Sequence, residues 1–374
     1  MRSTQLVTVR EGATDLLVPA GFCKKGPGKS TEAVFYNKQM EFSRDVSILL
    51  GRALFEPAWR ILDGLAASGA RGLRMANECD SSSQFHLNDR NSYASELIRQ
   101  NARLNGINDV TVHCRDLRGL LAEESFDYID IDPFGTPVGF IDAAVQACHD
   151  GGVLAVTATD TAPLSGTYPK TSSRRYGAVS VKSPFAHETG LRILLGHIVR
   201  EAAKHDRGCE PILSFHADHY FRCHLRILKG AGKADRALKS LGFAFYDEKT
   251  LARGAVSERQ DGSNARYAGP LWTGELHSPG LLDSISVHDA LGTRKRCMKA
   301  IDLWRGEAGA PPLYYRVDEL SKRTRRQPPR MTHLVEQLRS HGAQAVSTHF
   351  DPKGFKTDMP VGELLQLFED IADR

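Results

Sequence analysis

A carboxylate, a rigid turn and an aromatic ring follow one another at the predicted end of a buried strand. Residues 126–131 are mostly apolar and favour a strand, and they lead directly into Asp132-Pro133-Phe134-Gly135. At the edge of a sheet, the carboxylate of Asp132 can accept a hydrogen bond from an exocyclic amine of a planar base, and the ring of Phe134 can stack on that base. This combination indicates methylation of an amine on a nucleobase. Such chemistry also requires a methyl-donor site and a surface for nucleic acid.

Acidic residues also end the three preceding predicted strands, at Asp63, Asp89 and Asp116. The carboxyl ends of parallel strands meet at one edge, where open α/β sheets bind their ligands. A helix-capping role would explain one such aspartate, but four in succession, with Asp132, favour a ligand site. We expect Asp89 to hold two ribose hydroxyls and Asp116 to accept a hydrogen bond from an adenine amino group. Asp130, which we place on the opposite face of its strand from Asp132, is expected to have a supporting role.

The donor loop begins at Asp63 and carries Gly69 and Gly72 where a strand runs into a helix. Glycines there let the backbone approach a ligand closely, at the helix N-terminus. The loop lacks the Gly-Lys-Ser/Thr phosphate cradle of nucleotide triphosphatases and the tighter Gly-x-Gly-x-x-Gly of dinucleotide sites. S-adenosylmethionine fits better, because it has a ribose and an adenine but no phosphate. Its cationic sulfonium also suits an acid-rich pocket.

Strands alternate with helices between residues 59 and 160, which predicts a parallel sheet with helices on its faces. The predicted strands are residues 60–63, 85–89, 110–114, 126–132 and 152–159, and the predicted helices are residues 68–78, 93–104 and 140–148. Residues 161–182 are predicted as a loop, before a helix at 192–204 and two closing antiparallel strands at 212–215 and 220–228. We therefore expect an α/β fold, with a Rossmann-like domain over residues 1–270 and a smaller α+β domain over residues 271–374.

The composition is that of an ordinary soluble globular protein, with 41% hydrophobic and 25% charged residues. No apolar run approaches the roughly 20 residues that span a bilayer, and residues 1–11 lack the apolar core of a signal peptide. We expect a cytoplasmic monomer without a membrane partner. The seven cysteines include no Cys-x-x-Cys pair, which argues against a disulfide framework and a tetrahedral zinc site.

Basic residues gather in three segments, although the net charge is only +4. One such run would usually be a solvated surface, but three in a near-neutral protein favour contacts to nucleic-acid phosphates. The first lies beside the expected catalytic edge, the second lies near the C-terminus, and the third precedes the helix around Leu303. The first segment contains Lys170, Arg174 and Arg175. The second contains Lys322, Arg323, Arg325 and Arg326, and the third contains Arg294, Lys295, Arg296 and Lys299.

Long motifs spread from about residue 30 to 360 resemble the tRNA (guanine26-N2)-dimethyltransferases in their compact archaeal-type form. The similar segments are Ala33-Val34-Phe35-Tyr36-Asn37, Ser43-Arg44-Asp45, residues 63–74, Asp132-Pro133-Phe134-Gly135-Thr136-Pro137, Thr157-Ala158-Thr159-Asp160-Thr161-Ala162, His187-Glu188-x-Gly190-Leu191-Arg192, Asp218-His219-Tyr220-Phe221-Arg222, Gly269-Pro270-Leu271-Trp272 and Thr348-His349-Phe350-Asp351-Pro352. The resemblance implies a class I Rossmann-like methyltransferase domain, a C-terminal tRNA-binding domain, S-adenosylmethionine as cofactor and tRNA as partner.

The resemblance also implies roles for individual residues. Asp132 and Phe134 would engage the target guanine, with Phe35 as a second aromatic wall. Four residues would contact S-adenosylmethionine, namely Arg44, Arg71, Asp89 and Asp116. Core packing is the alternative for the two phenylalanines, and a surface ion pair is the alternative for the two arginines. Arg71 is the stronger candidate for the methionine carboxylate because it lies inside the glycine-bearing loop.

One feature departs from the family pattern. Many relatives carry two Cys-x-x-Cys pairs before the Gly-Pro-Leu-Trp segment, whereas residues 243–268 contain no cysteine, so we predict no zinc or other metal. The alternatives left open are N2-monomethylation at another tRNA or rRNA position, an adenine-N6 or cytosine-N4 methyltransferase, and an RNA-binding module with an inactive methyltransferase fold. The sequence leaves open the ratio of mono- to dimethylated product, the preferred tRNAs and modification of neighbouring positions.

Overall fold

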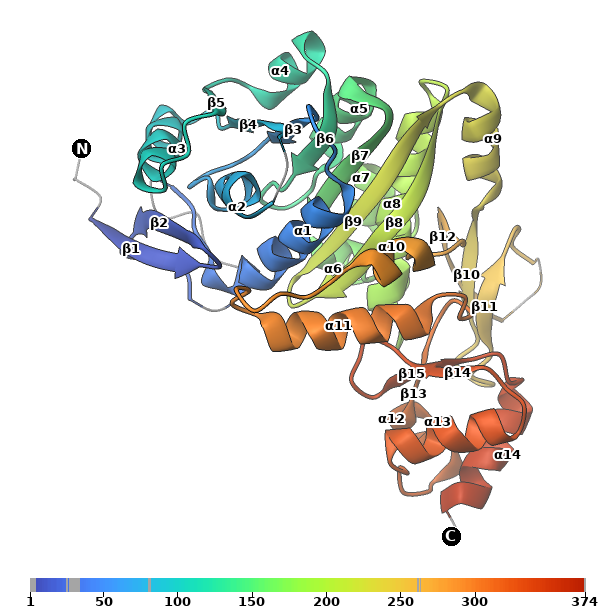
Figure 1. The fold of residues 1–374 in the computed structure, drawn as a ribbon. Coiled ribbons are helices and arrows are strands. Elements are labelled where there is room, and N and C mark those ends of the chain that lie inside the picture. Colours follow the sequence, from blue (N-terminus) through green and yellow to red (C-terminus); the bar gives the residue numbers. More distant parts are fainter. Residues whose placement is uncertain are drawn as a thin grey trace.

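A seven-stranded sheet forms the centre of the computed structural model, which describes residues 5–24, 26, 34–79, 82–260, 262 and 264–372 (Figure 1). Its strands, in spatial order, are β5 (Val110–His113), β4 (Gln84–Asn88), β3 (Arg60–Asp63), β6 (Phe126–Ile131), β7 (Cys148–Ala158), β9 (Tyr220–Lys229) and β8 (Arg207–Ala217). The first five are parallel, and β9 lies antiparallel between β7 and β8. The predicted α/β fold is confirmed. Because the strand order reverses between β3 and β6, ligands are expected at the carboxyl ends of these two strands.

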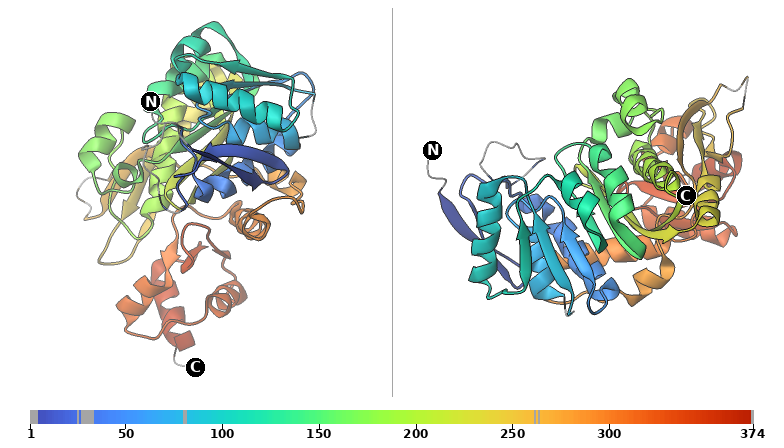
Figure 2. Two further views of the ribbon diagram at one scale, coloured as in Figure 1. Left: turned by 90° about the vertical axis from the view of Figure 1, so that its left-hand side faces the viewer. Right: turned by 90° about the horizontal axis from the view of Figure 1, so that it is seen from above.

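Helices cover both faces of the sheet, since alternate side chains of each strand point to opposite layers (Figure 2). Leu62 and Ile129 pack with α4 (Leu117–Glu123), α5 (Val138–Ala147) and α8 (Ala186–Ala203). Ile61 and Tyr128 pack with α1 (Glu41–Leu54), α2 (Ala70–Glu78) and α3 (Ser92–Leu104).

One segment of the fold differs from its sequence-based prediction, and a second segment had no prediction. The prediction of a loop at residues 161–182 was wrong, because the segment contains α6 (Thr161–Leu164) and α7 (Pro169–Tyr176). Pro169 starts α7 and Gly177 ends it with a φ of +60°, so residues that suggested a loop are in fact a helix start and stop. The hairpin of β1 (Leu6–Glu11) and β2 (Thr14–Pro19) was not anticipated, and it packs against α2 and α3.

The remaining elements lie C-terminal to β9. They are α9 (Ala231–Lys239), β10 (Leu241–Tyr246), β11 (Arg253–Val256), β12 (Arg266–Trp272), α10 (Pro279–Ser284), α11 (Arg294–Glu307), β13 (Tyr315–Arg316), α12 (Val317–Thr324), α13 (Met331–Ser340), β14 (Ala345–Ser347), β15 (Gly354–Thr357) and α14 (Val361–Ala372). Ile301 and Trp304 of α11 share the hydrophobic cluster of α1, whereas Leu320, Leu334 and Phe355 form the centre of a separate cluster. The domain division at residue 270 stays a prediction. None of the helices described in the structure is long and apolar enough to cross a bilayer.

A buried charge network joins α8 to the C-terminal elements. The carboxylate of Glu188 on α8 is fully buried and accepts hydrogen bonds from Arg192, at 3.0 Å, and from Lys356 on β15, also at 3.0 Å. It also accepts from the backbone N–H of Leu313 at 3.1 Å. Burial opposes ionisation of Glu188, but Lys356 and Arg192 outweigh it and hold its pKa below the usual value.

Replacement of Glu188 should therefore be costly. Glu188→Gln leaves the buried cations without their counter-charge, so we expect the free energy of unfolding to fall by about 3–5 kcal/mol. Chemical denaturation would measure the change. The control Glu201→Gln removes a carboxylate that pairs with the exposed Lys204, and it should cost less than about 1 kcal/mol. Equal losses in the two variants would contradict this account.

Candidate active site

A cavity of about 630 Å³ lies at the carboxyl edge of the sheet, a volume suited to a small-molecule ligand. Loops after the five parallel strands, the segment before α1 and the β8–β9 turn contribute its walls. Apart from Gly69, the residues predicted to bind the base or the methyl donor all line the cavity. They are Phe35, Arg44, Asp63, Arg71, Asp89, Asp116, Asp132 and Phe134. The fold thus brings together side chains that are almost 100 residues apart in the sequence.

The floor of the cavity is the loop from Asp63 into α2. The carboxylate of Asp63 accepts a hydrogen bond from the backbone N–H of Gly72 at 2.9 Å. A Cβ at Gly72 would lie 2.7 Å from Leu87, so only glycine lets α2 pack this close to β4. Gly69 has a φ of +78° and begins the helix in a conformation that favours glycine. Gly69 therefore shapes the loop from behind the cavity wall.

Asp89 and Asp116 lie at the cavity with their carboxylates held in place. Asp89 accepts hydrogen bonds from the backbone N–H groups of Ala67, at 3.0 Å, and Asn91, at 2.9 Å. Asp116 caps α4 by accepting from the N–H of Arg118 at 2.9 Å, and it also pairs with the Arg118 side chain. Asp116 therefore caps a helix and lines the cavity at once, so the capping and ligand roles do not exclude each other.

Arg71 is buried beneath the carboxyl edge of the sheet. Its guanidinium donates to Asp132 Oδ2 at 2.5 Å and to Ser47 Oγ at 2.7 Å, and it lies 3.6 Å from Asp130. The expected placement of Asp130 and Asp132 on opposite faces was wrong. Residues two apart in a strand share a face, which is why one guanidinium reaches both.

Two aspartates near Arg71, Asp130 and Asp63, have pKa values that are shifted in opposite directions. Burial opposes ionisation of Asp130, but Arg222, which is bidentate to it, and Arg71 hold its pKa at about 2. Burial and the neighbouring charge of Asp130 raise the pKa of Asp63 to about 7. The two arginines therefore favour the ionised form of Asp130, whereas burial and the Asp130 charge favour the protonated form of Asp63.

Arg44 makes a second buried ion pair beside the cavity. It donates to both carboxylate oxygens of Glu11, at 2.7 and 2.5 Å, and to the carbonyl oxygen of Asn37 at 3.0 Å. Burial disfavours the Glu11 charge, but Arg44 and Arg74 outweigh it and hold its pKa at about 2. The sequence analysis missed Glu11, because no local signal marks the hairpin that carries it.

Phe35 and Phe134 touch each other across the mouth of the cavity. Their ring centroids are 4.5 Å apart and the planes meet edge to face, at 78°. A base sandwiched between two rings needs a separation of roughly 7 Å, two contacts of about 3.5 Å. The base must therefore separate the rings, or it must stack on the face of Phe134, whose side chain is 56% exposed.

The turn after Asp132 is tied to the end of β7 and to α7. Gly135 donates its N–H to Thr159 Oγ1 at 2.7 Å, and Thr136 shares a hydrogen bond of 2.9 Å with the hydroxyl of Tyr176. That hydroxyl donates to Asp160 at 2.5 Å. The sequence analysis assigned no role to Thr159, Asp160 or Tyr176, although the first two belong to a motif shared with the family.

The basic residues expected to meet nucleic acid lie outside the cavity. Lys170, Arg174 and Arg175 are exposed on α7, where Arg175 pairs with Asp160 at 3.0 Å. The second group lies at the end of α12 and just beyond it, with Lys322, Arg323, Arg325 and Arg326 all exposed. In the third group, Arg296 pairs with Asp218 of the cavity wall at 3.0 Å.

Comparison with known proteins gives a consistent picture. A family model described as N2,N2-dimethylguanosine tRNA methyltransferase matches residues 21–369. A tRNA (guanine(26)-N(2))-dimethyltransferase of Thermococcus kodakarensis is 36% identical, with 98% of this chain and all of the relative covered. One from Methanosarcina acetivorans is also 36% identical, with 98% and 99% covered. The solved structure of Trm1 from Pyrococcus horikoshii with S-adenosyl-L-methionine superposes with a TM-score of 0.87 at 32% identity, covering 97% of this chain and 99% of that one.

The raised pKa of Asp63 predicts a component of stability that depends on pH. Its folded pKa of about 7 lies above the ordinary value of 3.8, so between these values the folded state keeps a proton that the unfolded state has lost. Stability from this group therefore falls as pH rises through that window. The asparagine of Asp63→Asn does not ionise, so the variant lacks this loss of stability. The unfolding free energy of the variant minus that of the parent protein should therefore increase from pH 4 to pH 7. Denaturation at stepped pH tests this, and a flat difference would contradict it.

Proposed function

The chain belongs to the N2,N2-dimethylguanosine tRNA methyltransferase family, and we propose that it transfers one or two methyl groups from S-adenosylmethionine to the exocyclic N2 of guanine 26 in tRNA. The observation that carries the proposal is Asp132, held by Arg71 at the wall of a cavity that three other strand-end aspartates also line. A cavity of this size and charge fits a ligand with a ribose, an adenine and a cationic centre.

We propose that the donor lies against the loop of residues 63–72. Asp89 would accept from the ribose hydroxyls and Asp116 from the adenine amino group, since both carboxylates line the cavity. Arg71 and Arg44 also line it and would attract the methionine carboxylate, although in the structure both guanidiniums pair with carboxylates of the chain. When bound, S-adenosylmethionine supplies an electrophilic methyl group on a sulfonium. This leaving group needs no further activation, so the proposed reaction uses no metal.

Asp132 would act on the guanine amine. The N2 lone pair is delocalised into the ring, which makes the amine a weak nucleophile. Arg71 holds Oδ2 of Asp132 and leaves Oδ1 to accept a hydrogen bond from N2–H. Such a bond raises electron density on nitrogen and stabilises the positive charge that develops as the N–C bond forms. Pro133 stiffens the turn, so the side chains of Asp132 and Phe134 keep a fixed orientation relative to each other. Positioning of the amine against the methyl group would supply much of the remaining rate acceleration.

Phe134 and Phe35 would bind the flipped base by stacking. Removing a base from its stack costs a few kcal/mol, and an aromatic partner returns about 1–3 kcal/mol per base. Because the two rings are in contact, the base either separates them or stacks on the exposed face of Phe134 alone. Phosphate contacts must supply the rest of the binding energy, which we assign to Lys170, Arg174 and Arg175 near the target. Lys322, Arg323, Arg325 and Arg326 would hold a more distant part of the tRNA, within a tRNA-binding region at residues 271–374.

We further propose that the protein acts as a cytoplasmic monomer. The positional claim is tested with labelled S-adenosylmethionine and tRNA transcripts that carry G or A at position 26, with the product mapped by mass spectrometry. Equal labelling of both transcripts would exclude position 26. Label at another guanine would instead favour the alternative, an N2-monomethyltransferase with a different target.

Removal of the Asp132 charge should separate catalysis from donor binding. We expect Asp132→Asn to lower kcat by about 10²–10⁴-fold, the range for loss of a positioned acid–base group. Donor affinity, measured by calorimetry, should change far less. The control Asp142→Asn, at an exposed position of α5, should retain full activity. Activity of Asp132→Asn within about threefold of the parent protein would exclude the proposed role.

Charge reversal on α7 should weaken tRNA binding in a way that depends on salt. The test variant combines Lys170→Glu with Arg174→Glu, which removes up to two phosphate contacts. The slope of log tRNA affinity against log salt concentration should therefore become shallower by about 1–2. The matched control reverses Arg236 and Lys239 on α9, which lies at the other end of β9 from the cavity. The same slope for parent and α7 variant would remove this surface from the binding site.

A further inference from the structure

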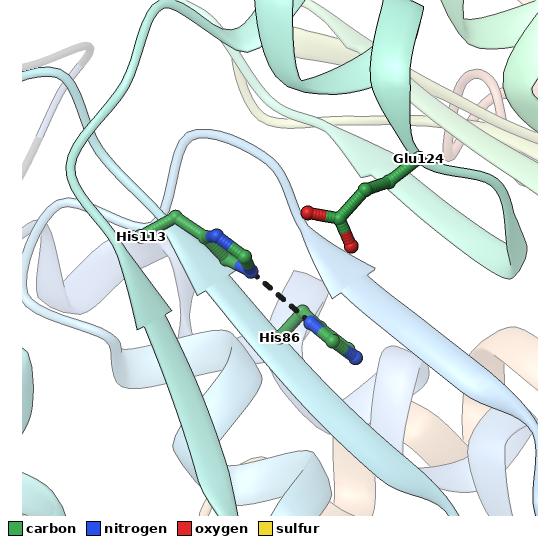
Figure 3. A group of neighbouring side chains, drawn as sticks. All are labelled: His86, His113 and Glu124. Carbon is green, nitrogen blue, oxygen red and sulfur yellow. Dashed lines mark hydrogen bonds between the residues drawn. The ribbon is translucent and has the colours of Figure 1, made fainter.

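Two histidines and a glutamate converge on the α4 side of the sheet, away from the cavity (Figure 3). His86 belongs to β4, His113 ends β5, and Glu124 follows α4 directly before β6. His86 Nδ1 and His113 Nε2 are 3.1 Å apart, and the Glu124 carboxylate points toward both rings. One nitrogen of each ring and one carboxylate oxygen all lie within 4.8 Å of one another.

We propose that His86, His113 and Glu124 form a binding site for a divalent transition metal ion of the zinc class. Two imidazoles and a carboxylate are a three-ligand set that zinc accepts, with water in the fourth position. Bonds of about 2.0–2.2 Å in a tetrahedron place ligand atoms roughly 3.4 Å apart. The two ring nitrogens already meet this spacing. The other separations, each within 4.8 Å, must shorten by at most about 1.4 Å, which rotation of the flexible Glu124 side chain can supply.

The Glu124 carboxylate has a competing partner, and this limits the affinity. Arg60 donates to Glu124 Oε2 at 2.5 Å. Arg60 is also held by the carbonyl oxygen of Ser125, at 2.6 Å, and by the ring of Phe126, whose centroid lies 4.7 Å from the guanidinium. The arginine can therefore keep its place while Glu124 turns toward a metal. His113 and Glu124 are only partly buried, so an ion can enter from solvent.

A second cluster, His277, Glu307 and His349, is less suited to a cation. It is almost fully buried, and the ammonium of Lys356 lies 3.5 Å from Glu307. A divalent ion there would meet a fixed positive charge close to its ligand atoms. The geometry therefore favours the site at His86.

Metal binding would fasten the edge of the sheet. Among the strands that the structure describes, β5 is an edge strand paired with β4, and the loop after it carries Asp116 into the cavity wall. A metal would join β4, β5 and the segment before β6 at one point. The proposal differs from the sequence-based expectation of no metal. That expectation was based on the absence of cysteine pairs, and the sequence gives no signal that ligands from three separate elements meet.

The test is a zinc titration of the full chain after removal of metals with a chelator. Calorimetry should detect one equivalent of bound zinc, and cobalt substitution should give the visible absorption of a tetrahedral site. His113→Gln and Glu124→Gln should each weaken zinc binding more than about 100-fold, beyond the usual effect of residues that only support a ligand. The matched control is His205→Gln, because His205 pairs with Asp142 at the surface without a third ligand.

The same titration can overturn the proposal. It fails if the parent protein binds no zinc, or if both ligand variants bind zinc as tightly as the control does. It also fails if His277→Gln abolishes binding while His113→Gln keeps it, since the metal would then occupy the buried cluster. Circular dichroism of each variant distinguishes loss of the site from loss of the fold.

Discussion

The guanidinium of Arg71, held between Asp130 and Asp132, is the interaction on which the site depends. Three carboxylates, those of Asp63, Asp130 and Asp132, lie at the ends of the adjacent strands β3 and β6, where their charges repel one another. Arg71 and Arg222 reduce this repulsion, and the proton retained by Asp63 reduces it further. The strand-end position that favours ligand binding is thus also the position at which unbalanced charge would be most costly.

The sheet and most of the cavity could be predicted because their signals are local. The hydrophobic pattern predicted the strands. An acidic residue at the end of successive parallel strands predicted that Asp63, Asp89, Asp116 and Asp132 lie close together in space. Contacts between distant segments gave no such signal. Glu11 reaches Arg44 and Arg74 only through the packing of a hairpin against α2. The helix α7 was missed because its proline and glycine were interpreted as loop residues.

The roles assigned to single residues are more complex in the structure than in the sequence. Asp116 caps α4 and lines the cavity, Arg175 pairs with Asp160, and Arg44 belongs to a buried ion pair. In each case the structural and functional interpretations describe the same atoms. A substitution at such a position changes packing, charge balance and ligand contacts together, so activity alone cannot separate these effects.

The position of β9 has a consequence for synthesis of the chain on the ribosome. Strand β8 emerges before β9, yet its neighbour among the described strands of the sheet is β9, so β7 presents an open edge until β9 has been made. Strand β9 also delivers Arg222, the bidentate partner of Asp130. A nascent chain that ends before residue 220 therefore combines an unpaired strand edge with a buried carboxylate that lacks its bidentate partner and has Arg71 alone beside it. Unpaired strand edges favour aggregation, and completion of the β8–β9 hairpin covers this edge and supplies Arg222 in the same step.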